Sequence, residues 1–558
     1  MGLICLTENE KMAELLLPNI DKTPEYYERL YPERNLPEGA RVTRVAPSPT
    51  GYLHLGTLFA ALVNRITATS TGGIFFTRIE DTDKKREIEG GIENITDGLN
   101  RFGIIPDEGF VSGTNEFGDY GPYKQSDRAE IYQTYVKDLI KKGYAYPCFC
   151  TAEELNAVRE EQEKNKIRTG YHGEYAKHRN ITFDEAKALI DSKKPYVIRL
   201  RSGGSEDKRI TFEDGIKGKI EMPQNDEDFV LLKSDGIPTY HFAHAIDDHL
   251  MHTTHIIRGD EWISSVPKHI ELFKILGFRV PKYAHVAPIM KLDNGSKRKI
   301  SKRKDPEAAV SYFAEQGYDC ENVIEYLMTI AASDYEDWRR ANPNSSYKDY
   351  KFNLKKMSVS GALFDQNKLL DVSKNRISRL NSSQVYEKLT AWANEFDKDF
   401  FNLLTKDMNF TLSMLAIDRD NSNKPRKDLA KWNEAKDFYA YFFKELFVPC
   451  YDLPDNISKE DAAKFLSEYL KEYKETDDRQ VWFNGIKAIA PRLGFAAETK
   501  EYKSDPDKYK GHSGDLSTVL RIAVTGRRNT PDLCSIMQVL GEKESKERIS
   551  NAIAFYEE

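Results

Sequence analysis

A strand followed at once by a constrained turn and a helix is the feature that most limits the fold of this chain. "RVTRV" (41–45) has the composition of a strand, and residues 57–70 have the apolar spacing of a helix. The turn between them, "APSPTGYLHLGT" (46–57), contains two prolines, two glycines and His54. Proline stiffens a loop and glycine permits close approach of the backbone, so this turn should have a fixed shape.

The alternation of strand and helix continues after this turn. "GIFFTRIED" (73–81) predicts a second strand, and "IEGGIENITDGLNRFGI" (88–104) predicts a helix closed by Gly103. "RAEIYQTYVKDLIKKGYAY" (128–146) predicts a further helix with Gly143 as its C-cap signal. Strands that alternate with helices indicate a doubly wound parallel sheet, whose ligands lie at the carboxyl ends of the strands.

The chain changes character twice after residue 146. A charged helix, "TAEELNAVREEQEKNK", is followed by short strands with glycine turns, which predict an inserted subdomain. "THIIRGDEW" (254–262) returns to a sheet strand, and the chain beyond about residue 305 has mainly helical periodicity. The short strands are expected within "PYVIRLRSGG" (195–204), "RITFEDGIKGKIEM" (209–222) and "DFVLLKSDGIPTYHFAH" (228–244).

Composition limits the class of protein. With 558 residues the chain is too long for one core, and 40% apolar and 31% charged residues are typical of globular domains. No apolar run is long enough to span a membrane, and six cysteines do not make a disulfide framework, so we expect a cytoplasmic protein without membrane contact. The net charge of −7 does not indicate nucleic-acid binding, but "SKRKISKRK" (296–304) and "KPRKDLAKW" (424–432) are locally basic.

The histidine of the opening turn has two interpretations. Free N–H groups at a helix N-terminus attract phosphate, so His54 beside Gly56 could contact a nucleotide. The turn is neither a Walker loop nor a dinucleotide fingerprint, and an isolated histidine there is more often part of a helix-capping turn. "KISKR" (299–303) is likewise a common basic loop when taken alone, although its lysines suit a polyphosphate.

Taken together, five ordered motifs are far more specific than either loop. The chain resembles bacterial-type glutamyl-tRNA synthetases, a class I aminoacyl-tRNA synthetase family, from Arg41 onward and most strongly over 41–310. The motifs that carry the resemblance are "RVAPSPTGYLHLGT" (44–57), "RIEDTD" (78–83), "YHFAHAIDDHLM" (240–251), "IIRGDEW" (256–262) and "KISKRKDPEAAV" (299–310).

The resemblance implies a multidomain α/β protein: a Rossmann-type parallel-sheet catalytic domain with an inserted α+β subdomain, then an all-α anticodon-binding region. Residues 1–38, a polar lead-in, match nothing in the family and are assigned to an N-terminal extension. The other expected parts are the two halves of the catalytic domain (39–145 and 234–290), an inserted acceptor-binding subdomain (146–233), a stem-contact domain with the KISKR loop (291–375) and a helical anticodon-binding domain (376–558).

The resemblance also assigns a glutamate pocket. The family's arginines for the substrate carboxylates match Arg44 and Arg258, and its acid for the α-amino group matches Glu80. His244 stands where many relatives have Asn, and it can still donate a hydrogen bond. The remaining pocket positions match Ala46, Ser48 and Tyr240.

For ATP, the family's two signatures match the turn and the KISKR loop. The implied reaction forms glutamyl-adenylate and pyrophosphate, after which the 3′ end of tRNA-Glu takes the glutamyl group. His54 and Lys302 are expected to stabilise charge rather than to act as nucleophiles. Mg²⁺ would accompany ATP, held mainly by phosphate and water. The residues implied for ATP are His54, Gly56, Thr57 (where many class I enzymes have a second histidine), Glu261, Trp262, Lys299, Ser301, Lys302 and Arg303.

The sequence offers two other candidate metal sites, and we favour neither. "CFC" (148–150) could begin a zinc site, but Tyr175 and Lys177 occupy the place where some relatives have Cys-x-His. His172 and His178 lie nearby, yet two thiols without partners do not hold zinc, so we expect partly buried thiols and no metal. We interpret Asp247–Asp248 as a structural turn.

The sequence leaves several alternatives to a monomeric glutamate–tRNA ligase. Arg258 and "PSPTG" argue against a glutaminyl-tRNA synthetase, as does the helical C-terminal half. The length argues against the short relative that modifies a tRNA base, and the helical half argues against a small-metabolite nucleotidyltransferase. A catalytically inactive tRNA-binding module would not be expected to keep His54, Arg258 and Lys302 together. The charging of tRNA-Gln, and the residues that read the anticodon, stay open.

Overall fold

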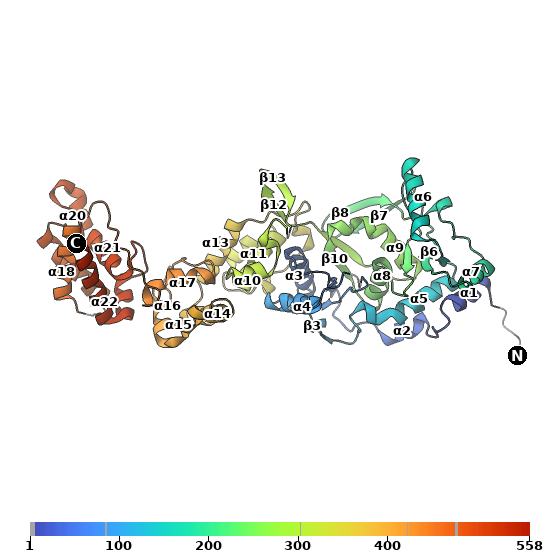
Figure 1. Ribbon diagram of the computed structural model, residues 1–558, viewed down its shortest axis with the longest axis horizontal. Helices are drawn as coiled ribbons and strands as arrows, with labels where there is room; N and C mark the ends of the chain where they lie inside the picture. Colours follow the sequence, from blue (N-terminus) through green and yellow to red (C-terminus); the bar gives the residue numbers. More distant parts are fainter. Residues whose placement is uncertain (1–5, 84–85, 302, 421, 475–477) are drawn as a thin grey trace. The chain divides into compact units, whose positions relative to one another are not determined.

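The computed structural model describes residues 6–83, 86–301, 303–420, 422–474 and 478–558. The chain forms two compact units (Figure 1). Unit 1 comprises residues 1–312 and 323–365, and unit 2 comprises residues 313–322 and 366–558.

The first half of the unit 1 sheet follows the predicted alternation. β1 (Val42–Val45) pairs in parallel with β2 (Ile74–Thr77), which pairs in parallel with β3 (Glu108–Ser112). The helix α3 (Leu55–Thr69) connects β1 to β2, and α4 (Gly91–Arg101) connects β2 to β3. The predictions for both strands and both helices are confirmed, and β4 (Asn115–Phe117) adds an antiparallel edge.

The chain then returns on the other side of β1. β10 (His255–Gly259) lies beside β1, where Thr254 N donates to Val42 O at 3.0 Å. β10 pairs in parallel with β11 (Lys282–Val286), and α9 (Val266–Ile275) connects them. The strand order therefore reverses between β1 and β10, which is where an open α/β sheet leaves a crevice at its carboxyl edge.

The predicted inserted region contributes to two sheets. β5 (Ala145–Cys148), β6 (Val197–Leu200) and β9 (Val230–Leu232) form a separate antiparallel sheet. The hairpin of β7 (Arg209–Asp214) and β8 (Gly218–Pro223) instead extends the main sheet, because β7 pairs with β11 at Asp214 and Tyr283. The helices of this region are α6 (Ala152–Lys164) and α7 (Phe183–Asp191).

One predicted strand stretch is shorter than expected. In 228–244 only β9 is a strand, and α8 (Tyr240–Leu250) begins at Tyr240. Phe242, Ala243 and Ile246 are buried at helical spacing, so the apolar side chains favour a helix there. This helix places Tyr240 and His244 on one face, four residues apart.

The N-terminal residues are a folded part of unit 1 rather than a polar lead-in. α1 (Glu8–Leu16) begins with a capping box at Thr7, and α2 (Pro24–Leu30) follows it. Met12, Leu16 and Tyr27 are buried in the same core as α5 (Ala129–Lys141). The prediction for this segment was wrong because a few apolar residues at helical spacing suffice to bury one face among many charges.

A β-hairpin and short helices complete unit 1. β12 (Met290–Asp293) pairs antiparallel with β13 (Ser296–Lys299), and β12 also bridges to Leu363. The helices beyond the hairpin are α10 (Ser311–Glu315), which ends in unit 2, α11 (Cys320–Ala331), which begins there, and α12 (Tyr335–Ala341).

The rest of unit 2 is helical among its described residues, as predicted. Its core is one continuous cluster that includes Leu389, Trp432, Phe465 and Leu520. The helices are α13 (Gln366–Ile377), α14 (Ser382–Phe396), α15 (Lys398–Lys406), α16 (Met408–Ala416), α17 (Ala435–Phe438), α18 (Lys459–Glu472), α19 (Arg479–Ile489), α20 (Thr499–Ser504), α21 (Ser513–Thr525) and α22 (Leu533–Glu557). None of the helices described in either unit is long and apolar enough to cross a membrane.

Candidate active site

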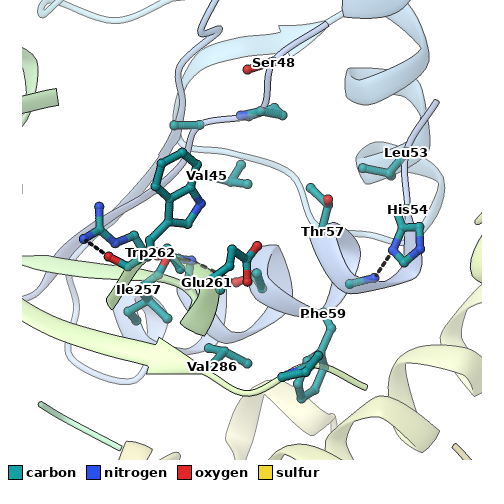
Figure 2. A pocket seen from close by; sticks show the side chains of 18 of the residues that line it. Val45, Ser48, Leu53, His54, Thr57, Phe59, Ile257, Glu261, Trp262 and Val286 are labelled. Carbon is teal, nitrogen blue, oxygen red and sulfur yellow. Dashed lines mark hydrogen bonds between the residues drawn. The ribbon is translucent and has the colours of Figure 1, made fainter. Parts of the chain in front are cut away.

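A cavity of about 580 Å³ opens at the reversal of strand order in unit 1. Figure 2 shows Trp262 and Glu261 on one side of it, and His54 and Thr57 on the other. The cavity therefore lies at the carboxyl ends of β1 and β10, as predicted for a ligand of a wound sheet. The predicted residues that line it are Arg44, Ala46, Ser48, His54, Gly56, Thr57, Glu80, Tyr240, Arg258, Glu261, Trp262 and Lys299.

His54 is the N-cap of α3. Its Nδ1 accepts a hydrogen bond from Gly56 N at 2.9 Å, which assigns the ring proton to Nε2 (Figure 2). A Cβ added at Gly56 would lie 3.3 Å from His54 Nδ1, so glycine lets the ring fold back over the helix end. The histidine is thus a helix cap that also lines the cavity, and the two interpretations of the sequence are compatible.

The segment after the KISKR loop lies against this turn. His54 and Ala309 form an antiparallel bridge, and Val310 N donates to Leu53 O at 3.4 Å. The opening turn and the segment that follows the KISKR loop therefore meet, although more than 240 residues separate them.

An ion pair and a backbone hydrogen bond hold together the two ends of the KISKR loop. Asp305 accepts two hydrogen bonds from the Arg298 guanidinium, at 2.6 and 2.8 Å, and one from Ser301 N at 2.9 Å. The Arg298 pair lowers the pKa of Asp305. Lys299, at the end of β13, reaches the cavity wall, whereas Ser301 and Arg303 do not line it. Lys302 lies outside the described residues.

A buried ion-pair network forms one wall of the cavity. Arg44 donates to both oxygens of Asp248, from Nε at 2.9 Å and from Nη2 at 3.1 Å. Arg78, which is fully buried, donates to Asp248 at 3.0 Å and to Glu80 at 3.2 Å. Burial tends to lower the pKa of Arg44, but the Asp248 carboxylate outweighs it, and the pKa stands above its usual value. Each buried charge here has an opposite charge.

Glu80 lies at the edge of this network with its carboxylate toward the cavity. It is 8% exposed and pairs with Arg78 alone among the described residues. Burial raises the pKa of Glu80, and the arginines nearby oppose that shift. An ammonium group in the cavity would give this carboxylate a second partner.

Arg258 is held by neutral groups instead of carboxylates. Its Nη1 donates to Tyr240 Oη at 3.0 Å, and its Nη2 donates to Trp262 O at 3.3 Å. Its Nε lies 3.2 Å from His285 Nε2, and its Nη2 lies 3.2 Å from His269 Nδ1. Among the described residues no carboxylate bonds to its guanidinium group.

His244 lies behind the cavity rather than in its wall. It is fully buried, and its Nδ1 lies 2.8 Å from Asp248 Oδ2. Burial lowers the pKa of His244 to about 3, so the ring is neutral and donates its Nδ1 proton to Asp248. His244 therefore steadies the carboxylate that holds Arg44.

Three residues of this site were not predicted from the sequence: Asp214, His269 and His285. None of the three lies in the five motifs that carry the family resemblance. Asp214 comes from the predicted insertion, and it reaches the site only because β7 joins the main sheet. One available signal was that His285 stands in the otherwise uncharged stretch "YAHVAPIM" (283–290).

The structure also supplies the partners that "CFC" lacked in sequence. Cys148, Cys150 and His178 bring their ligand atoms within 4.8 Å of one another. The hydroxyl of Tyr171 lies 3.3 Å from Cys148 Sγ and 3.5 Å from Cys150 Sγ. His172 instead lies against Arg168 O at 2.9 Å. The expectation of two thiols without partners was therefore incomplete.

Comparison with known proteins places the chain in a family. Residues 41–371 match the model described as "tRNA synthetases class I (E and Q), catalytic domain", and residues 430–553 match the model described as "Anticodon binding domain". The chain belongs to the class I tRNA synthetases of the E and Q family. Family membership gives the crevice, the two signature loops and the helical unit one common explanation.

Curated relatives match almost the whole chain. The chain is 51% identical to the glutamate–tRNA ligase of Clostridium beijerinckii, over 97% of this chain and 98% of the relative. It is 48% identical to the glutamate–tRNA ligase of Acetivibrio thermocellus, over 98% of this chain and 100% of the relative. The N-terminal helices therefore fall within the region of similarity for the most part.

A solved structure is similar over both units. The crystal structure of a glutamate tRNA ligase from Elizabethkingia meningosepticum, in complex with its amino acid, superposes with a TM-score of 0.72. The identity is 28%, and the match covers 92% of this chain and 99% of that chain. The α/β fold with a helical C-terminal part is thus shared with this family member.

Proposed function

We propose that the chain is an ATP-dependent ligase that activates glutamate as glutamyl-adenylate and transfers the glutamyl group to tRNA-Glu. The observation that carries the proposal is the division of one cavity into two chemical ends. Arg44, Arg258 and Glu80 supply two cations and an acid at one end, and His54 and Lys299 line the other. This arrangement matches a substrate with two carboxylates and one amino group, next to a polyphosphate.

The two ends bring the reacting groups of glutamate and ATP together. Arg258 and Arg44 would bind the carboxylates of glutamate, and Glu80 would bind its ammonium group. His54 Nε2 and the ammonium group of Lys299 would stabilise charge on the phosphates while the α-carboxylate attacks the α-phosphate. Lys302 and Arg303, in the same signature, are proposed for that role too, with Ser301 as the small residue between them. Mg²⁺, bound mainly by phosphate and water, would neutralise charge there.

The lining of the cavity is also consistent with the other side-chain roles that the family resemblance implies. Ala46, Ser48 and Tyr240 would complete the glutamate end, with His244 acting through Asp248. Gly56, Thr57, Glu261 and Trp262 would lie near the nucleotide. The anticodon-binding part of unit 2 would read single-stranded bases of the tRNA. That the protein works as a cytoplasmic monomer stays a prediction, which gel filtration and cell fractionation would check.

Pyrophosphate exchange tests the proposal. Glutamate should support exchange between pyrophosphate and ATP, measured with and without total tRNA, whereas glutamine should not. Aminoacylation of purified tRNA-Glu and tRNA-Gln then decides which tRNA is charged. A folded protein that exchanges with neither amino acid, with or without tRNA, contradicts the proposed activity.

The Cys148, Cys150 and His178 cluster fits a structural zinc ion better than the sequence indicated. Two cysteine sulfurs and one imidazole nitrogen are ligand types that zinc prefers, and the Tyr171 hydroxyl lies beside both sulfurs. Hydrogen bonding with Cys150 lowers the pKa of the Cys148 thiol, which favours the thiolate form that zinc binds. Metal analysis of purified protein, compared with Cys148→Ser, should find about one zinc ion that the variant lacks.

A further inference from the structure

A chain of three side chains runs behind the guanidinium group of Arg258. Arg258 lies on β10, His285 lies on the neighbouring strand β11, and Asp214 lies on β7, next to β11. Arg258 Nε and His285 Nε2 are 3.2 Å apart, and His285 Nδ1 and Asp214 Oδ2 are 2.6 Å apart. All three residues are at least nine-tenths buried.

Asp214 is fixed from several directions. Its Oδ1 accepts hydrogen bonds from Ile216 N at 3.0 Å and from Lys217 N at 2.9 Å. Its Oδ2 accepts from both Nδ1 and the backbone N of His285. Hydrogen bonds from His285 and these backbone groups outweigh burial and hold the pKa of Asp214 below its usual value. A carboxylate with so many donors has one orientation.

The orientation of Asp214 sets the tautomer of His285. An ionised carboxylate is an acceptor only, so it assigns the imidazole proton to Nδ1. His285 Nε2 is then left with a lone pair that faces the N–H group of Arg258 Nε. Burial lowers the pKa of His285, which keeps the ring neutral at physiological pH. Arg258 is therefore positioned by an acceptor that carries no net charge.

Arg258 has no direct carboxylate partner within the described part of the chain, and this matters for an anionic substrate. A carboxylate at hydrogen-bond distance would neutralise Arg258, as Asp248 does for Arg44. A neutral imidazole accepts the same hydrogen bond and leaves the positive charge of the guanidinium group for the ligand. His269 acts from the other side in the same way, because its Nδ1 lies 3.2 Å from Arg258 Nη2.

We propose that His285, with its tautomer set by Asp214, is a positioning residue that aims Arg258 at the glutamate carboxylate without neutralising it. The inference rests on the proposed role of Arg258 in binding glutamate. It predicts that the hydrogen-bonding character of His285 Nε2, rather than the bulk of the ring, controls glutamate binding.

Two substitutions at His285 separate these possibilities. His285→Gln places an amide oxygen near the former Nε2 and keeps an acceptor for Arg258. His285→Asn places an amide near the former Nδ1, so it keeps the bond to Asp214 and loses the acceptor. In pyrophosphate exchange with tRNA, His285→Asn should raise the KM for glutamate on the order of tenfold above His285→Gln, the loss expected for one charge-assisted hydrogen bond. The KM for ATP should change little in either variant.

Asp214→Asn tests the tautomer directly. The amide oxygen can still accept from Ile216 N and Lys217 N, while the amide N–H₂ faces His285 Nδ1. Nδ1 must then accept, and the ring proton moves to Nε2, where it opposes the N–H group of Arg258. This variant should raise the KM for glutamate at least as much as His285→Asn does. It also provides the readout should a His285 variant fail to fold.

The outcomes distinguish the inference from the proposed function. His255→Asn, on β10 but outside the cavity, is the control and should leave both KM values unchanged. Equal glutamate KM values for the two His285 variants, or an unchanged KM in Asp214→Asn, overturn the positioning role. Arg258→Ala is measured in parallel: if it leaves the KM for glutamate unchanged, the pocket assignment is wrong. If wild-type protein does not exchange, the proposed activity itself fails.

Discussion

Arg44 and Arg258 lie at the carboxyl ends of neighbouring strands and line one cavity, but their surroundings differ. Arg44 donates hydrogen bonds from Nε and Nη2 to the Asp248 carboxylate. The guanidinium group of Arg258 instead donates hydrogen bonds to a tyrosine hydroxyl, a backbone carbonyl and two histidine nitrogens. The first region is a set of paired charges, and the second region places one charge among neutral acceptors.

The difference gives the Arg44 region and the Arg258 region separate tasks, stability and substrate affinity. A buried ion pair is costly to break, because removal of one partner leaves the other charge buried and unpaired. The Arg44 region should therefore carry stability. A cation among neutral dipoles keeps its charge for a ligand, so the Arg258 region should carry most of the affinity for an anionic substrate.

Removal of the central carboxylate should have the largest effect. Asp248→Asn leaves Arg44 and Arg78 without the charge that pairs them, and it should lower the free energy of unfolding by about 3–5 kcal/mol. Urea unfolding measures this change. Asp235→Asn, which removes an exposed carboxylate, is the control and should change the stability by less than about 0.5 kcal/mol. A loss below about 1 kcal/mol in Asp248→Asn would contradict the paired-charge description.

Lowered pH should destabilise the fold through two histidines of α8 before the Asp248 carboxylate takes up a proton. Burial lowers the pKa of His241 to about 4 and that of His244 to about 3, whereas their ordinary value is 6.5. Above pH 6.5 both rings are neutral in the folded and unfolded states. Below pH 6.5 the unfolded chain takes up protons that the folded chain refuses, so stability is lost as the pH falls toward 4. Asp248, whose pKa is lowered well below 3.8, stays ionised in this range.

Two histidines of this kind should lower the free energy of unfolding by about 4 kcal/mol between pH 7 and pH 5. Urea unfolding at several pH values gives the slope, and hydrogen exchange of α8 locates the loss. His241→Gln removes one titrating group and should flatten the slope. A slope unchanged by this substitution would show that other groups dominate.

Truncation of each arginine should separate stability from affinity. Arg258→Ala should raise the KM for glutamate by roughly 10- to 100-fold, the value of a charge-assisted hydrogen bond pair, and leave the KM for ATP close to normal. Arg44→Ala should raise the glutamate KM too, but it should also lower the melting temperature, because Asp248 loses a partner. Equal losses of stability in the two variants would remove the distinction between the regions.

The smallest effect is expected at the residue that joins the regions. His244 donates to Asp248 from Nδ1, and its ring lies 4.3 Å from that of His269. His244→Asn keeps a donor for Asp248, so the KM for glutamate should change by no more than about threefold. His244→Leu, which keeps bulk without a donor, should cost more. If both variants behave alike, the hydrogen bond to Asp248 contributes little.

Much of the candidate site could be predicted from short stretches of sequence. Chain-adjacent residues such as Ser48, His54 and Gly56 keep their spacing in any fold, and so do Arg258, Glu261 and Trp262. The wound sheet was also predictable, because its strands and helices alternate with regular periods. The N-terminal helices were missed, since their buried face consists of only a few residues such as Met12 and Tyr27 among many charges.

The sequence by itself determined the order of strands and helices, the prolines and glycines of the opening turn, and the residue types at the cavity ends. Only the tertiary structure decided which neutral or charged partner each arginine received. Asp214 meets His285 because a hairpin of the inserted region pairs with β11. Asp248 meets Arg44 and Arg78 because α8 brings its carboxylate to side chains of β1 and of the segment that follows β2. Such contacts depend on long-range strand pairing and helix packing, which local periodicity does not encode.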